Sequence, residues 1–259
     1  MILLDHLLFL VLAIVHPVLG FFSFRRLLRR IAAGERIDRA HLYNVTMIGH
    51  WTLFAVALAL WAGTGRDWQL LGLGLNLDAR FLAGIVLTAL GIVFLVRQVR
   101  EVDTADQDDI RTVHRSLGKL DVIIPRNGNE LGRFYALSTT AGIVEELLWR
   151  GYIIWYLASF MPIWVAALLS AVLFGIAHAY QGPANLPRIT LVGIAFAGLY
   201  LLTGSVWLPM ILHAAVDILQ GRMAYGVVRR FDTNGPTDTM EGTVDACLLY
   251  TSDAADDNR

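Results

Sequence analysis

Cysteine is scarce in this chain: Cys247 is the single cysteine among 259 residues. One thiol excludes an intrachain disulfide, and it excludes a metal site built from several cysteines. Charged residues are also scarce, at 17% of the chain, against roughly 25% in soluble domains. Hydrophobic residues make up 56%. This balance is typical of an integral membrane protein.

A large excess of charge of either sign is absent as well. The formal net charge is −1, which gives no electrostatic argument for a nucleic acid or for any strongly charged partner. No basic residue precedes the first hydrophobic run, residues 2–22, and no small-x-small cleavage site ends it. We therefore expect this run to be a membrane-spanning helix and not a signal peptide.

Seven apolar stretches have, or nearly have, the length needed to cross a bilayer, which is about 20 residues of helix. They are residues 2–22, 43–62, 81–96, 134–158, 163–179, 189–202 and 206–224. The sequence thus predicts an all-α, polytopic transmembrane helical bundle of about seven spans in the cell membrane, with the lipid bilayer as its surroundings.

Arginine and lysine alternate in density from loop to loop. The first and third predicted loops and the stretch after the last helix are rich in arginine, whereas the second, fourth and sixth loops have almost none. Basic residues collect on the cytoplasmic side of membrane proteins. We therefore expect the N-terminus outside and the C-terminus in the cytoplasm.

The fourth predicted span carries three ionisable residues in an apolar setting: Glu145, Glu146 and Arg150. A charge at the middle of a membrane helix costs about 2.5–3.5 kcal/mol on insertion scales, so such residues usually have a function. Glu146 and Arg150 are four apart and share a helix face, where they can form an ion pair. Glu145 points about 100° away and needs other partners.

Two later spans each carry a histidine. His178 follows a stretch of small residues that permits close helix packing. His213 and Asp217 are four apart and lie on one face of the last span. A carboxylate beside an imidazole can deprotonate a water as it attacks a carbonyl, and a second imidazole can stabilise the oxyanion.

Other interpretations of these residues stay open at this point. A His/His/Glu set could bind zinc, although the His-Glu-x-x-His spacing of the common zinc proteases is absent. Buried acids and histidines also relay protons in transporters, but such folds have inverted repeats and broken helices, which we do not find. A noncatalytic membrane scaffold or immunity protein of the same fold is the third alternative.

Three motifs, in this order, resemble those of the CAAX protease and bacteriocin-processing (CPBP, or Abi) family of intramembrane glutamic endopeptidases. They are Glu145-Glu146-x-x-x-Arg150, Phe174-x-x-x-His178 and His213-x-x-x-Asp217. The resemblance covers roughly residues 132–221, and it implies a metal-independent peptidase without a cofactor, acting on a peptide or protein at the membrane. The catalytic core would then lie in the last four spans, residues 132–231, after N-terminal helices and cytoplasmic loops in residues 1–131.

The resemblance also implies a role for each motif residue. Glu145 is expected to be the general base and His178 to help hold the water. His213 with Asp217 is expected to stabilise the oxyanion, and Glu146 and Arg150 are expected to support the site. The family often has asparagine in place of Asp217, and an aspartate donates a hydrogen bond only when it is protonated.

The last residues, 232–259, change in character. They begin with a turn-rich linker and end in a polar, acidic run without periodicity. We expect a disordered tail here, and its sequence resembles translated adapter read-through more than a native C-terminus.

Overall fold

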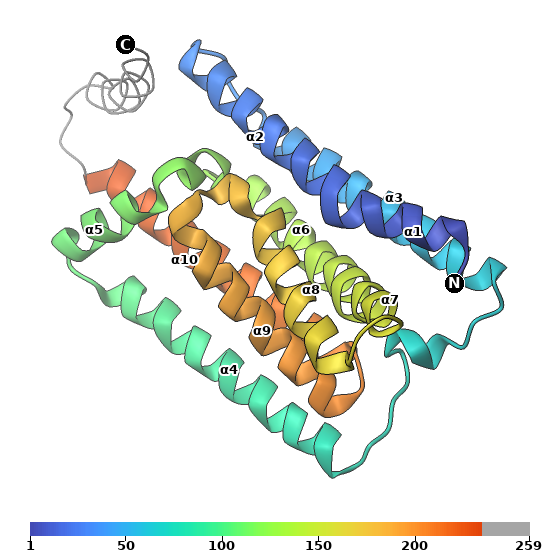
Figure 1. Ribbon diagram of the computed structural model, residues 1–259. Coiled ribbons are helices and arrows are strands. Elements are labelled where there is room, and N and C mark those ends of the chain that lie inside the picture. The colour runs from blue at the N-terminus through green and yellow to red at the C-terminus, as the bar shows by residue number, and fades with distance from the viewer. Residues whose placement is uncertain (235–259) are drawn as a thin grey trace, which may run out of the picture.

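The computed structural model describes residues 1–234, and this part of the chain is helical with no β-strand. Its α-helices, labelled as in Figure 1, are α1 (Leu3–Leu10), α2 (His16–Ala32), α3 (Arg39–Gly63), α4 (Ala79–Thr104), α5 (Gln107–Leu117), α6 (Gly128–Glu146), α7 (Ile154–Ala158), α8 (Ile163–Ala177), α9 (Leu186–Thr203) and α10 (Trp207–Asn234). Two π-helical segments, η1 (Val11–Val15) and η4 (Leu147–Ile153), join α1 to α2 and α6 to α7. Short 3-10 turns are η2 (Trp68–Leu71), η3 (Gly118–Ile123), η5 (Ala179–Gln181) and η6 (Pro183–Asn185). The prediction of an all-α fold is confirmed.

Polar residues set the starts of three long helices. Asp38, Asp78 and Asn127 precede α3, α4 and α6, and each side chain accepts a hydrogen bond of 2.9 Å from the backbone N–H three residues later. These N–H groups at a helix start have no partner within the helix, so a capping side chain supplies one. The caps therefore mark where the chain leaves each loop and enters the bundle.

The helices of the predicted core are neighbours. In Figure 1, α6, α8, α9 and α10 lie together, with α4 along one side of them and α1, α2 and α3 along the other. α6 contacts both α3 and α10, α8 contacts α9, and α4 contacts α10 and α9. Because α6 lies between α3 and α10, its glutamates can reach residues from both halves of the chain.

A buried ion pair joins the N-terminal helix to the core. Asp5 of α1 is fully buried and accepts two hydrogen bonds of 2.7 Å from the Arg66 guanidinium. The hydroxyl of Tyr152, in η4, donates to the Asp5 carbonyl oxygen at 2.9 Å. A two-bond arginine–carboxylate pair has a defined geometry, so α1 is held in a fixed position against η4.

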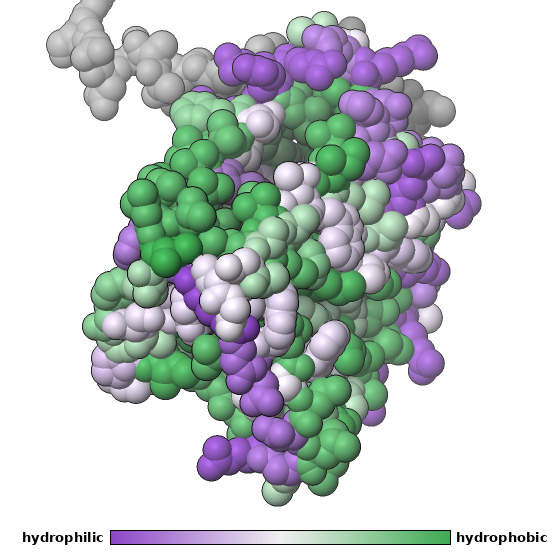
Figure 2. Space-filling model, turned by 90° about the vertical axis from the view of Figure 1, so that its right-hand side faces the viewer, coloured by the Kyte–Doolittle hydropathy of each residue, from purple (hydrophilic) through white to green (hydrophobic). Residues whose placement is uncertain are grey.

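The outside of the bundle is apolar, as a membrane protein requires. Within the described part of the chain, four helical stretches are long and apolar enough to cross a membrane: Leu3–Ala32, Arg39–Gly63, Ala79–Thr104 and Pro183–Thr203. On α4, Leu82, Val86 and Leu90 are each more than half exposed. Figure 2 shows hydrophobic residues over much of one face, with hydrophilic residues gathered mainly toward its upper end and a smaller group at its lower end. The membrane bundle is thus confirmed, and the remaining predicted spans are helices too, while the count of seven stays a prediction.

The C-terminal boundary differs from the prediction. α10 continues to Asn234, three residues beyond residue 231. Asp232 lies 3.5 Å from the Arg126 guanidinium, and the Thr233 hydroxyl donates to the Arg229 carbonyl oxygen. These contacts favour the helical conformation, so the first residues of the expected tail are ordered. Residues 235–259, including Cys247, lie outside the described part of the chain.

Candidate active site

The two adjacent glutamates lie where α6 changes from α-helix into the π-helical segment η4. Such π-helical segments are rare and occur frequently at functional sites. Glu146 is fully buried, and the Glu145 side chain is 15% exposed. The two carboxylates point to different neighbours, as the helical rotation between consecutive residues predicts.

A glycine one turn earlier brings α10 close to these glutamates. A Cβ atom on Gly142 would lie 2.7 Å from the backbone nitrogen of Ala214 and 2.9 Å from the carbonyl oxygen of Met210. Those distances are too short for any side chain. Gly142 therefore permits the close approach that places His213 beside Glu146.

Glu145 lies between two histidines. Its Oε1 atom is 3.0 Å from Nε2 of His50, on α3. Its Oε2 atom has no hydrogen-bond partner among residues 1–234 and lies 3.9 Å from Nε2 of His178, at the end of α8. One oxygen is therefore bonded, and the other is free and faces an imidazole.

The orientation of His178 is set by its own helix. Its Nδ1 atom donates to the carbonyl oxygen of Phe174 at 2.8 Å, because a carbonyl can only accept. In the neutral ring the proton is then on Nδ1, which leaves a lone pair on Nε2 directed toward Glu145. The predicted proximity of Glu145 and His178 is therefore present.

A second cluster surrounds Glu146. Its Oε1 atom accepts hydrogen bonds from Arg150 at 2.9 Å and from Nδ1 of His213 at 2.7 Å. The predicted ion pair of Glu146 with Arg150 is confirmed. Arg150 also donates to the Gly193 carbonyl oxygen, at 3.2 Å, and its guanidinium lies 4.5 Å from the centre of the Phe174 ring. Glu146 thus fixes the direction of the His213 ring.

Asp217 is close to His213 without forming a normal hydrogen bond. Its Oδ2 atom is 3.6 Å from His213 Nε2, and its side chain is 37% exposed, whereas that of His213 is 7% exposed. The strong partner of the His213 imidazole is therefore Glu146, on the opposite ring nitrogen. The pairing of His213 with Asp217 is weaker than the sequence spacing predicts.

Tyr180 lies in the turn η5, next to His178. The two ring centroids are 5.9 Å apart, and the Tyr180 ring is also 5.3 Å from that of Phe24, on α2. Burial raises the pKa of the Tyr180 phenol to about 12, so the hydroxyl stays protonated at neutral pH. Tyr180 therefore offers a neutral hydroxyl at the rim of the Glu145 and His178 pair.

Sequence reasoning did not single out His50, which forms the closest contact with the Glu145 carboxylate. On the second predicted span, beside Trp51, a lone histidine is more often a packing residue than a catalytic one. The sequence does contain a signal for His50, because an ionisable residue inside an apolar span usually has a specific partner.

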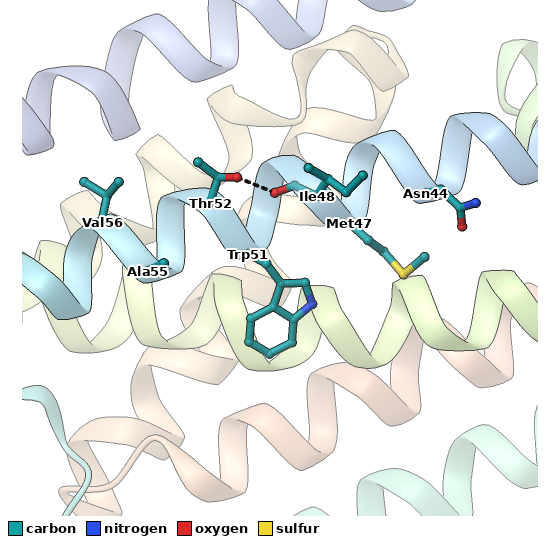
Figure 3. A pocket seen from close by; sticks show the side chains of 7 residues that line it. All are labelled: Asn44, Met47, Ile48, Trp51, Thr52, Ala55 and Val56. Atoms are coloured by element: carbon teal, nitrogen blue, oxygen red, sulfur yellow. Dashed lines mark hydrogen bonds between the residues drawn. The ribbon is translucent and has the colours of Figure 1, made fainter.

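A hollow of about 730 Å³ runs along another face of α3. It is lined from Asn44 to Val56, and in Figure 3 Trp51 points from α3 toward the neighbouring helix. The Trp51 indole N–H donates to the Thr140 hydroxyl of α6 at 3.3 Å. None of the predicted site residues lines this hollow, so it is separate from the carboxylate and histidine clusters.

Comparisons with known proteins match the part of the chain that contains the three motifs. A model of the family "Type II CAAX prenyl endopeptidase Rce1-like" matches residues 127–219. The protein "Putative membrane peptidase YdiL" of Bacillus subtilis (strain 168) is 32% identical over 94 residues, which are 36% of this chain. The match spans only 38% of that relative's length. No solved structure matches the chain.

The matched region contains all three motifs and, apart from His50, the residues that surround the two glutamates. It lies within a bundle of apolar helices, as a membrane peptidase family requires. The family match, the related membrane peptidase and the order of the motifs agree, and residues 127–219 of this chain are therefore similar to the CAAX protease family.

Proposed function

We propose that the protein is an intramembrane endopeptidase that hydrolyses a peptide bond with a water activated by Glu145. The observation that carries the proposal is the unpaired Glu145 Oε2 atom, 3.9 Å from His178 Nε2. A water at a normal hydrogen-bond distance of about 2.8 Å from both atoms fits this separation, with roughly 90° between its two contacts. The water would donate one proton to Oε2 and the other to the free lone pair of Nε2.

The reaction follows from this position. The water oxygen bonds to the scissile carbonyl carbon while one water proton passes to Glu145 Oε2. The substrate carbonyl thereby becomes a tetrahedral oxyanion. When the carbon–nitrogen bond breaks, Glu145 returns that proton to the leaving nitrogen. The products are a carboxylic acid and an amine, and Glu145 ends as it began.

His213 is the proposed partner of the oxyanion. Its Nδ1 proton is committed to Glu146, so Nε2 carries a proton when the ring is an imidazolium. That N–H can then donate to a developing negative charge, which is the interaction an oxyanion site requires. Asp217, 3.6 Å from the same nitrogen, is proposed to attract this proton and favour the cationic ring.

The substrate is proposed to be a peptide segment held at the membrane, because Glu145 and Glu146 lie within the helical bundle. The matching family is described by its action on CAAX prenyl proteins, so a prenylated C-terminal peptide is the first substrate to test. The arginine-rich loops support a C-terminus in the cytoplasm, with Tyr180 at the cytoplasmic rim.

The test uses purified protein in lipid vesicles with two kinds of substrate. One is a fluorescence-quenched, farnesylated peptide ending in a CAAX sequence, and the other is the membrane fraction of a bacterial host. We expect cleavage of the peptide, or new N-termini in membrane proteins that protein-free vesicles do not produce. If neither appears, the chain is better explained as a noncatalytic scaffold or a transporter.

Metal dependence gives a second prediction. Among residues 1–234, the His, Cys, Asp and Glu side chains form no group of three suited to a metal ion. We expect EDTA and phenanthroline to leave the cleavage rate unchanged, because Glu145 and His178 are proposed to hold and activate the water without a metal ion. Complete loss of activity that added zinc restores would favour the zinc alternative.

A further inference from the structure

The side chain that forms a hydrogen bond with the proposed base comes from outside the matched family region. His50 lies on α3, and its Nε2 atom is 3.0 Å from Glu145 Oε1, across 95 residues of sequence. The side chains are 13% and 15% exposed. α3 packs directly on α6, so this contact is part of a helix interface that the N-terminal half of the chain supplies.

Both ring nitrogens of His50 face hydrogen-bond acceptors. Nδ1 is 2.9 Å from the carbonyl oxygen of Thr46, which can only accept. Nε2 is 3.0 Å from a Glu145 oxygen, which accepts when the carboxylate is ionised. The two bonds together need a doubly protonated ring opposite a carboxylate. A base must be an ionised carboxylate to take a proton from water, so this protonation state matches the proposed role of Glu145.

The ring also limits how Glu145 can turn. With Oε1 held by His50, the carboxylate cannot rotate freely, and Oε2 remains directed at His178. His16, at the start of α2, lies edge-on to the His50 ring with 6.1 Å between centroids. Its ring packs against His50 on the side of α2, so residues from α2 and α3 both support the carboxylate.

We propose that His50 is a positioning residue that holds the Glu145 carboxylate so that its free oxygen faces the attacking water. This inference rests on the proposed function of Glu145. It adds a component from α3 to a site whose known motifs all lie in α6, η4, α8 and α10. Neighbours that orient a metal ligand typically contribute about 10- to 100-fold to activity, and we expect an effect of the same size for a residue that orients a catalytic carboxylate.

The test compares His50→Leu, His50→Gln and Trp51→Phe on the farnesylated peptide. Leucine removes the bond to Oε1, so kcat is expected to fall about 10- to 100-fold while KM stays unchanged, because His50 does not touch substrate. Glutamine can place an N–H near the Nε2 position and should recover part of kcat. Trp51→Phe removes a neighbouring α3–α6 hydrogen bond without touching Glu145, so it should leave kcat unchanged.

A second measurement does not depend on activity. In NMR spectra of isotope-labelled histidine, His50 should have two protonated ring nitrogens in the wild type and one in Glu145→Gln, where the amide can donate to Nε2. A singly protonated His50 in the wild type contradicts the inference. Equal losses of kcat in His50→Leu and Trp51→Phe also contradict it, because His50 would then serve only helix packing.

The two proposals fail in different ways. If Glu145→Gln keeps full activity, or the wild type cleaves no substrate, the proposed function is wrong, and the NMR spectra still test the His50–Glu145 pair. If Glu145→Gln is inactive while His50→Leu has the kcat of the wild type, only the role of His50 is wrong.

Discussion

Glu145→Gln is expected to abolish peptide cleavage while the protein stays folded. Glutamine has nearly the same shape and can still form a hydrogen bond with His50, by donating its amide N–H to Nε2, but it cannot take a proton from water. General-base catalysis typically contributes about 10²- to 10⁴-fold, and the rate should fall by a factor in that range. The measurement is kcat on purified protein, together with thermal unfolding in detergent.

The matched control is Glu101→Gln, which neutralises an exposed carboxylate at the end of α4. It makes the same chemical change outside the two clusters, so both activity and unfolding should match the wild type. Full activity in Glu145→Gln would remove Glu145 as the base. An unfolded variant would show that the carboxylate is needed for structure first.

Glu146→Gln is expected to lower stability more than any other single change in the site. Glu146 and Arg150 are both fully buried, and the carboxylate is the sole anionic partner that the guanidinium contacts among residues 1–234. Removing one member of a buried ion pair typically costs about 3–5 kcal/mol, because an uncompensated charge remains. The measurement is the free energy of unfolding in mixed micelles.

A double variant separates the stranded charge from other effects. In Glu146→Gln/Arg150→Met no guanidinium is left without its carboxylate, and methionine can fill the space against Phe174. Replacement of a buried ion pair by apolar residues is often close to neutral, so the double variant should be more stable than Glu146→Gln alone. Unchanged stability in the single variant contradicts the importance of the pair. Activity should stay low in both variants, because His213 loses its orienting carboxylate.

Local spacing was sufficient for part of the site. The i, i+4 distance between Glu146 and Arg150 predicted their ion pair, because residues four apart share a helix face. The rotation of about 100° between adjacent residues predicted that Glu145 would have different partners. The same reasoning overestimated the contact of His213 with Asp217, since a shared face does not tell which nitrogen of a ring forms the stronger bond.

Contacts between residues far apart in the sequence could not be predicted from local spacing. His213 is 67 residues from Glu146, and His50 is 95 residues from Glu145. Which histidine reaches which carboxylate depends on how closely the helices approach, and at Gly142 that approach is set by the absence of a side chain. Asp5 lies near the start of the first predicted span, yet its side chain is fully buried, because Arg66 pairs with its carboxylate and Tyr152 bonds to its backbone carbonyl.

The amino-acid sequence alone determined the membrane character, the all-α class and the identity of the motif residues. These follow from composition and from short-range periodicity, which each helix expresses independently of the others. The division of the polar residues into a Glu145 cluster with two histidines and a Glu146 cluster with Arg150 and His213 was decided by tertiary structure. The reason is physical: a hydrogen bond requires two atoms within about 3 Å, and only the packing of separate helices sets distances on that scale.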